Sequence, residues 1–386
     1  MSGPLDGFLI LDLTRLLPGA YCTLLLADLG AEVVKVEEPN RGDPLRDAPP
    51  LVDGAGAAHL ALDRGKRSIT LDLKSPGGPE VLRRLAERAH AAVESFRPGV
   101  ADRLGVGYEA LSERNPRLVY CSLTGYGQDG PYRARPGHDV DYVALAGLLD
   151  PTGTPDGPPV IPAVQMADLA GGMGAAVGIL ACLLEAERGG RGRFVDVAML
   201  DAAASWGALL WSTYLATGTP PARGRWFLTG ALACYRVYAT GDGKYLAVGA
   251  LEPKFWRALC EALGVPELVQ SQLDPERQDE FAERLEEIFL SRSRDEWVEA
   301  LSGLEACVAA VNDVGEALAD AQLVHRGMVG EAGGRVAGPG PLVKVSGHAR
   351  GPVGPAPALG EHTEEVLTQA GFTPAQVAGL RQRHIV

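Results

Sequence analysis

Short apolar runs alternate with amphipathic stretches over the first 125 residues. The run Phe8–Leu13 is followed by apolar residues at helical spacing over Tyr21–Leu29, which Gly30 ends, and then by the β-branched run Val33–Val36. The alternation continues, in chain order, through Ser68–Leu73, Pro79–His90, Ala91–Ser95 and Arg117–Leu123. Strands that alternate with helices predict an α/β fold with a parallel, doubly wound sheet, which binds ligands beyond the carboxyl ends of its strands.

The pattern changes after residue 124. Two loops rich in Gly and Pro, Thr124–Gly137 and Asp150–Pro162, flank a predicted apolar helix over 139–149. Loops of this length inside a compact enzyme are more often functional than idle.

From about residue 225 the composition predicts a smaller α+β unit. Two alternating strands within 234–250 surround Asp242-Gly243, a pair suited to a type I′ hairpin turn. Three charged helices are predicted after it, at Pro253–Leu263, Pro275–Leu290 and Arg294–Leu301.

Two longer apolar stretches raise the question of a membrane. Leu169–Leu184 is uncharged but too short to span a bilayer, and Ala202–Ala222 contains several hydroxyl side chains and two prolines. Both are interpreted as buried helices, and no membrane partner is expected.

Charge and cysteine usage narrow the functional classes. The 386 residues carry 36 basic and 49 acidic side chains, a net charge of −13, which argues against a nucleic-acid partner. The six cysteines form no C-x-x-C pair, so neither a metal site nor a redox motif is indicated. Scattered thiols and an amino-terminal segment without a basic region favour a cytoplasmic protein.

The first strand–helix–strand unit invites comparison with a dinucleotide site. Such a site needs G-x-G-x-x-G at the first turn and an acid after the second strand. Glu37 or Glu38 supplies the acid, but the turn reads TRLLPGAYC. Without the glycines a pyrophosphate cannot approach the backbone in the usual way, so NAD is disfavoured. A nucleotide-like ligand held by a different loop remains open.

Several cations stand near predicted strand ends. Lys66, Arg67 and Lys74 flank one strand, and Arg97 and Arg103 lie before and inside a helix. They suit a phosphate-bearing ligand, and they equally suit a solvated edge that discourages aggregation.

His138 and Asp168 are the candidate acid/base pair. Each stands at the predicted start of a helix, where free N–H groups favour developing negative charge. Asp168 could alternatively be only a helix N-cap. The Gly- and Ala-rich turns after it, however, indicate that another backbone segment or a ligand approaches this helix closely. Glu252 precedes a helix that starts with proline, and a cap is the alternative there too.

At these residues the chain resembles the α-methylacyl-CoA racemase branch of the class III CoA-transferase family. The resemblance runs nearly from end to end, and its segments are specific only together. They are LDLTRLLPGAYCTLLLADLGAEVVKVEEP, RGKRSITLDLK, FRPGVADRLG, NPRLVY, TGYGQDGP, GHDVDYVALAG, ADLAGG, VGALEPKFW and GEHTEEVLTQAGF.

The resemblance implies an interlocked homodimer. Its large Rossmann-like domain is built from both chain ends, here 1–220 and 326–386, and its small domain from 221–325. It also implies that His138 and Asp168 are the two acid/bases and that Glu252 acts with His138.

CoA binding follows from the same resemblance. The implied substrate-binding residues are Leu71, Asp72, Leu73, Lys74, Arg97, Arg103, Gly137, Asp139, Val140, Asp141 and Tyr142. Three departures stand out: Glu38 replaces a CoA-binding arginine, with Arg41 the nearest substitute; Asp141 replaces an asparagine; and Arg225–Cys234 barely matches the racemase segment.

The implied reaction is epimerisation of 2-methylacyl-CoA thioesters by proton transfer through an enolate. One group removes the α-proton and a second returns it on the other face. Histidine ordinarily titrates near pH 6.5, whereas aspartate needs burial to become a useful base. Backbone N–H groups of Gly137–Val140 are expected at the thioester oxygen.

Two alternatives remain at this stage. A CoA-transferase would use Asp168 to form an acyl anhydride, and an inactive acyl-CoA-binding scaffold would use neither group. His138 favours the racemase. The acyl-CoA is substrate, and no cofactor or metal is expected.

Overall fold

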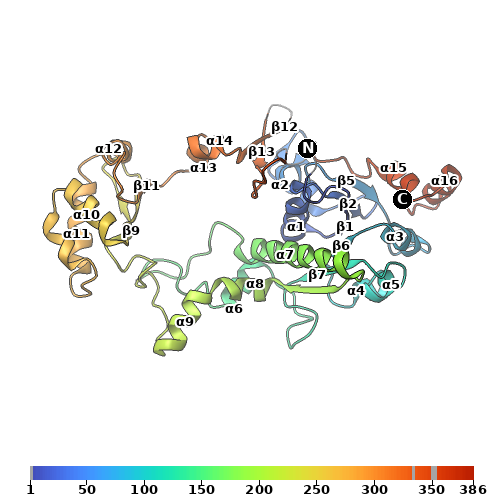
Figure 1. Ribbon diagram of the computed structural model, residues 1–386, viewed down its shortest axis with the longest axis horizontal. Coiled ribbons are helices and arrows are strands. Elements are labelled where there is room, and N and C mark those ends of the chain that lie inside the picture. Colours follow the sequence, from blue (N-terminus) through green and yellow to red (C-terminus); the bar gives the residue numbers. More distant parts are fainter. Residues whose placement is uncertain (1–2, 333–334, 349–353) are drawn as a thin grey trace. The chain divides into compact units, whose positions relative to one another are not determined.

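The computed structural model describes residues 3–332, 335–348 and 354–386, and the chain divides into two compact units (Figure 1). The first comprises Met1–Ala146, Ala163–Trp206 and Ala321–Val386, and the second Gly147–Pro162 and Gly207–Asp320. Compared with the sequence-based ranges, 147–162 and 207–220 group with the smaller unit.

A six-stranded sheet organises the first unit. The strands run in the order β5-β2-β1-β6-β7-β8, and every neighbouring pair is parallel. Their bounds are β1 Leu9–Leu13, β2 Glu32–Glu37, β5 Arg67–Thr70, β6 Ala91–Glu94, β7 Val119–Thr124 and β8 Phe194–Ala198. The predicted parallel α/β architecture is confirmed.

Neighbouring residues of strand β1 pack into two different hydrophobic cores, one on each face of the sheet. Ile10 packs in the core that includes residues of α1 (Leu16–Asp28) and α7 (Met166–Gly189). Leu11 packs in the opposite core with residues of five other helices. Those helices are α3 Gly78–Ala86, α4 Val100–Arg103, α5 Tyr108–Ser112, α15 Thr363–Gln369 and α16 Pro374–Gln382. Both faces of the sheet are therefore covered, which explains the continuous apolar runs.

The helix α1 begins five residues before the predicted start. Pro18 and Gly19 resemble a loop in sequence, but proline lacks an N–H that the first helical turn does not need. Shorter elements complete this unit: η1 Pro44–Arg46, β3 Leu51–Val52, β4 Ala55–Gly56, α2 Ala57–Leu62, α6 Asp139–Leu145, α8 Met199–Trp206, α14 Ala321–His325, β12 Val329–Ala332 and β13 Arg335–Pro339.

Among the described residues, α7 is long and apolar enough to cross a membrane by length and composition. Here it packs against α1. A Cβ at Gly172 would lie 2.5 Å from the Pro18 carbonyl oxygen, and one at Gly171 would lie 2.7 Å from Met199 Cγ. The Gly-rich face of α7 is therefore explained by a close approach of neighbouring chain segments.

The second unit combines a small antiparallel sheet with helices. The antiparallel sheet β11-β10-β9 packs with four amphipathic segments around Trp256, Phe281 and Phe289. The elements are β9 Tyr235–Ala239, β10 Tyr245–Gly249, α10 Pro253–Ala262, η2 Pro266–Ser271, α11 Gln278–Phe289, α12 Arg294–Ala300, β11 Val308–Ala310 and α13 Val314–Leu318.

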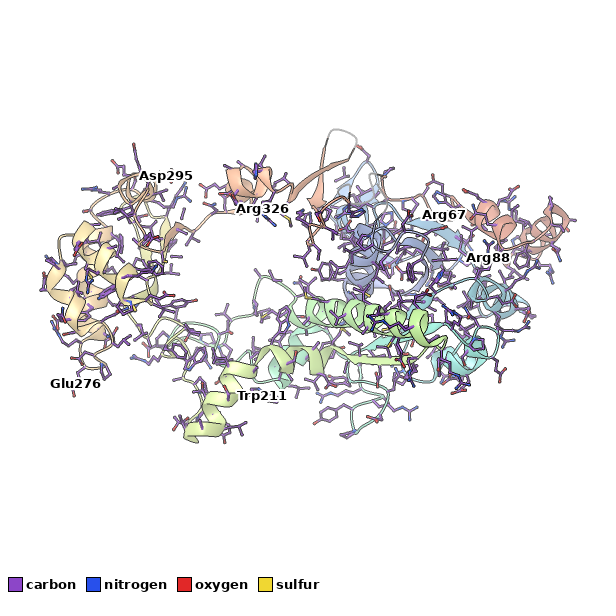
Figure 2. The ribbon with its side chains drawn as sticks, viewed as in Figure 1. Arg67, Arg88, Trp211, Glu276, Asp295 and Arg326 are labelled. Atoms are coloured by element: carbon purple, nitrogen blue, oxygen red, sulfur yellow. The ribbon has the colours of Figure 1, made fainter. Side chains whose placement is uncertain are left out.

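Two expectations are corrected in this unit. The hairpin is joined by a longer loop over 240–244 in which only Gly243 has positive φ, because Asp242 instead uses its carboxylate to bind Thr240 and the Arg294 N–H. The apolar stretch 202–222 breaks at Gly207, and none of the ten residues of α9 (Ala208–Thr217) is buried. Leu215 is 80% and Trp211 48% exposed. Figure 2 labels Trp211 on this helix. An apolar sequence indicates that the helix packs against something, but it does not show whether the partner is the same chain or another one.

Candidate functional site

A cavity of about 400 Å³ brings His138 and Asp168 together. It opens where three neighbouring strands end, because Arg15 follows β1, Ser95 follows β6 and Gly125 follows β7. The predicted position of a ligand beyond the carboxyl ends of parallel strands is therefore where the structure is hollow. Four arginines also line it: Arg15, Arg97, Arg133 and Arg135.

Asp168 stands in the first turn of α7, and Asp139 fixes that turn. One carboxylate oxygen of Asp139 accepts the N–H groups of Ala167 at 2.7 Å and Asp168 at 3.1 Å. Asp139 follows His138 directly, so the same short segment positions both members of the pair. The resemblance assigned Asp139 to CoA; in the structure it does not line the cavity, and it caps the helix that carries Asp168.

Burial raises the pKa of the Asp168 carboxyl to about 6. The neighbouring Asp139 charge raises it further, and the nearby His138 lowers it in part. A carboxyl with this pKa exchanges protons near neutral pH, which an exposed aspartate does not.

His138 is the N-cap residue of α6, as predicted, and its side chain is exposed at the cavity. The backbone N–H of His138 already has a partner, because the Asp141 carboxylate accepts it at 2.9 Å. The expectation that the Gly137–Val140 N–H groups face the substrate oxygen is therefore wrong for the His138 N–H.

We expect the pH dependence of catalysis to report Asp168. When Asp168 acts as the base, the initial rate of deuterium uptake into one epimer should fall as pH decreases through about 6, because the carboxyl becomes protonated. Asp139→Asn should shift this inflection to lower pH, since the Asp139 charge raises the pKa of Asp168. An inflection that does not move in this variant contradicts the assignment; rates of each epimer between pH 4 and 9 provide the measurement.

A second cavity, of about 190 Å³, adjoins the strand ends of β1, β2 and β5. Leu71, Asp72, Leu73 and Lys74, which the resemblance assigns to CoA, line it. Arg97 lines the first cavity instead, and Arg103 lines neither, although its neighbour Leu104 lines the second.

Glu38 is part of the wall of this second cavity. Its carboxylate lies 3.6 Å from Lys74 Nζ and 3.7 Å from an Arg15 guanidinium nitrogen. The position where the resemblance to racemases implies an arginine thus carries an anion that partly neutralises two cations, while Arg41 does not line the cavity.

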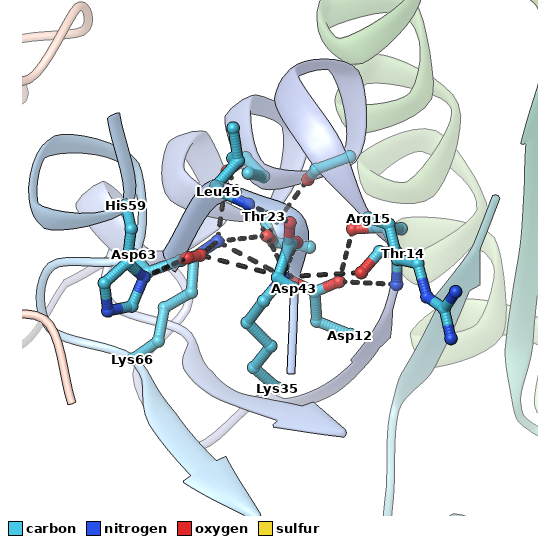
Figure 3. A network of polar contacts seen from close by, with 12 residues as sticks. Asp12, Thr14, Arg15, Thr23, Lys35, Asp43, Leu45, His59, Asp63 and Lys66 are labelled. Atoms are coloured by element: carbon cyan, nitrogen blue, oxygen red, sulfur yellow. Dashed lines mark hydrogen bonds and ion pairs between the residues drawn. The ribbon is translucent and has the colours of Figure 1, made fainter. Parts of the chain in front are cut away.

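The segment Thr14–Leu16 contributes to the walls of both cavities. Buried ions of the network in Figure 3 hold this segment in place. Asp12 accepts the Thr14 N–H, Lys35 donates to the Thr14 carbonyl, and Asp43 accepts the Leu16 N–H. Leu16 has φ of 63°, a left-handed conformation that is strained for leucine. The network therefore holds a strained cavity wall in place.

Lys66 belongs to this network rather than to a ligand or a solvated edge, so both sequence interpretations are wrong for it. Its ammonium group lies 2.7 Å from Asp63 and 3.4 Å from Asp12, and all three side chains are fully buried. Arg67 pairs with Glu32 and Glu365. Lys74 alone of the three is exposed beside a cavity.

Lys66→Met should destabilise the fold by about 3–5 kcal/mol, because it leaves buried carboxylates short of a partner. Arg114→Met is the surface control: Arg114 pairs with Glu80 and Glu87, but all three are exposed, so its loss should cost below about 1 kcal/mol. Urea unfolding of both variants measures the difference, and equal losses would contradict the importance assigned to the network.

Glu252 lies in the second unit, as the N-cap residue of α10 with Pro253 after it. The capping position anticipated from sequence is present, although its side chain makes no capping hydrogen bond. Its action with His138 stays a prediction.

Sequence reasoning missed Asp139 as a helix cap and the side chains of the loop over 124–137. Tyr126, Arg133 and Arg135 all line the main cavity. The length and Gly/Pro content of the loop marked the segment as functional, but not these positions. Across the described residues no cluster of three or more His, Cys, Asp or Glu side chains is arranged to hold a metal ion.

Comparison with known proteins gives consistent results. The family model described as CoA-transferase family III matches residues 5–363. The chain is 34% identical to human alpha-methylacyl-CoA racemase over 99% of this chain and 97% of that one. It is 35% identical to mouse succinyl-CoA:glutarate CoA-transferase over 95% and 86%. A CAIB/BAIF family protein from Brucella suis matches in structure with a TM-score of 0.85 and 31% identity, over 96% of this chain and all of that one.

Proposed function

The chain belongs to CoA-transferase family III, and from that membership we propose that it is a racemase that interconverts the two epimers of 2-methylacyl-CoA thioesters. One observation carries the proposal: His138 and Asp168 line the same cavity. Membership of the family supports an acyl-CoA substrate. The pair of His138 and Asp168 supports a proton transfer at the carbon next to the thioester carbonyl.

The reaction needs one group on each face of the α-carbon. In one direction the Asp168 carboxylate takes the α-proton, and the C–H electron pair moves onto the thioester oxygen to form an enolate. The protonated His138 imidazole then delivers a proton to the opposite face, which gives the other epimer. In the reverse direction the two groups exchange roles, so each turnover leaves one protonated and the other not.

The raised pKa of Asp168 supports this use. A carboxylate that titrates near pH 6 is a stronger base than an ordinary aspartate, and its conjugate acid still exists near neutral pH. Asp168 can therefore act as a base in one direction and as an acid in the other under the same conditions.

A CoA-transferase is the second candidate, and the similar identity to a succinyl-CoA:glutarate transferase favours keeping it. There the Asp168 carboxylate attacks the thioester carbonyl, the CoA thiolate leaves and a mixed anhydride forms. The thiolate then attacks the Asp168 carbonyl of the anhydride, which releases the first acid and leaves CoA as a thioester on Asp168. A second acid attacks that thioester to form a new anhydride, and the thiolate released in this step attacks its acyl carbonyl, which gives the new acyl-CoA and restores Asp168. This route needs Asp168. It breaks no bond between carbon and hydrogen, so it gives His138 no role in proton transfer.

The remaining assignments accompany the proposal. The Leu71–Lys74 cavity suits the CoA end of the substrate, and the cavity with His138 suits the acyl end. The chain works as an interlocked homodimer, supported by the apolar helix α9, none of whose residues is buried. It needs no cofactor or metal, and it acts in the cytoplasm.

Incubation of a single 2-methylacyl-CoA epimer in D2O, without any acid acceptor, tests the proposal. Deuterium uptake at the α-carbon together with inversion is the expected result. Acyl exchange that requires an added carboxylic acid would favour the transferase, and binding without either reaction would leave only a scaffold.

A further inference from the structure

We propose that Tyr126 is a further catalytic residue, whose hydroxyl donates a hydrogen bond to the thioester oxygen as negative charge develops there. The inference rests on the proposed function, since it concerns the acyl end of the same cavity. It starts from an unexplained polar atom rather than from a motif.

The Tyr126 hydroxyl is buried, and among the residues that the structure describes it has no hydrogen-bond partner. A buried phenol normally finds one, because an unpaired hydroxyl away from water is unfavourable. Other hydroxyls of the cavity wall have partners: Tyr142 donates to the Gly137 carbonyl at 2.7 Å, and Ser95 accepts the Arg15 N–H at 3.0 Å. Thr124 accepts the Gly127 N–H at 3.1 Å. Among the described residues, the Tyr126 hydroxyl is the one of this wall that neither donates nor accepts a hydrogen bond.

Its position is next to the reacting groups. Tyr126 lines the cavity together with His138 and Asp168. A Cβ on Gly137, the residue before His138, would lie only 2.8 Å from the Tyr126 hydroxyl oxygen. Glycine at 137 thus leaves the hydroxyl the space it occupies beside the imidazole-bearing residue.

The ring is also held in a fixed orientation. It packs edge to face against Tyr142, with ring centroids 5.1 Å apart, and against Tyr132 at 5.6 Å. A donor whose ring packs against two other rings reorganises little when charge appears, and this property makes such donors effective in catalysis.

The chemistry of enolate formation calls for a donor at this place. When the α-proton leaves, its electron pair ends on the thioester oxygen, which is bonded to the neighbouring carbon. The backbone N–H of His138 cannot donate to that oxygen, because the Asp141 carboxylate already accepts it. Tyr126 shares its proton with the oxygen without giving it up, and the charge returns to carbon when the second acid/base delivers a proton.

Tyr126→Phe separates this role from a structural one. Because the hydroxyl has no partner in the free protein, its removal should leave the urea midpoint unchanged or raise it. The turnover number should nevertheless fall about 100-fold, the usual loss when one oxyanion donor is removed, with little change in KM. Tyr142→Phe is the matched control: it breaks a hydrogen bond that the structure contains, so it should lower the midpoint.

Deuterium uptake and acyl transfer by wild type and Tyr126→Phe, followed side by side, decide the matter. Where wild type takes up deuterium, turnover by Tyr126→Phe within about threefold of wild type overturns the role of Tyr126 and leaves the proposed function standing. Wild type that only transfers acyl groups to an added acid overturns the proposed function, and the role of Tyr126 with it, because no enolate forms. A large loss of turnover with an equally large loss of stability also overturns it. Wild-type protein that catalyses neither reaction overturns both.

Discussion

His138→Ala is expected to turn the protein into a catalyst that acts on one face only. Inversion of the α-carbon should fall by about a thousandfold or more, because no group remains to serve the second face. Asp168 is still present, so the epimer whose α-proton faces Asp168 should continue to exchange with D2O and retain its configuration. The other epimer should show no uptake.

Uptake of deuterium into each pure epimer, followed by mass spectrometry and chiral analysis, provides the measurement. His325→Ala is the matched control, because His325 is exposed in the same unit and lines neither of the two cavities assigned to the substrate. Calorimetric binding of the CoA ester should change little in either variant. Inversion by His138→Ala at a rate near wild type would remove His138 from the mechanism.

Asp168→Asn should give the mirror image of that result. The epimer that His138 serves keeps its exchange, the other loses it, and inversion again falls by about a thousandfold or more. The transferase alternative predicts a different pattern, in which Asp168→Asn abolishes acyl transfer and His138→Ala does not. Comparison of the two variants on both epimers therefore separates the mechanisms, with Asp201→Asn, an exposed residue in the first turn of α8, as the control.

The Asp168 variant should also change stability with a definite sign. Folding raises the pKa of this carboxyl above its ordinary value, so the folded state binds the proton more tightly than the unfolded state. The stability that this proton contributes is present at low pH and is lost as pH rises through about 6. Asp168→Asn should therefore be more stable than wild type at pH 8 but not at pH 4. Lower stability at pH 8 would contradict the cause given for the raised pKa.

The fold was predictable because its signals are local. Ile10 and Leu11 are both fully buried, on opposite faces of the sheet, so the strand carries a continuous apolar run rather than an alternating one. The helix α1 was placed too late only because Pro18 has the same appearance in a loop and in a first helical turn.

The site was predictable only in part, because its organisation depends on pairings distant in sequence. His138 and Asp168 were found as residues, but the cap by which Asp139 connects their segments spans 28 positions. Lys66 resembled a surface cation because its partner Asp12 lies 54 positions away in the sequence, and no neighbouring residue indicates that the two pair. The orphan hydroxyl of Tyr126 is a property of packing and has no sequence signature.

A crystal structure with a bound, unreactive 2-methylacyl-CoA analogue tests the central claim most directly. The account predicts that the α-carbon lies between the two groups, with the His138 imidazole on one face and the Asp168 carboxylate on the other. A complex in which Asp168 approaches the thioester carbonyl carbon while His138 lies away from the α-carbon would contradict it.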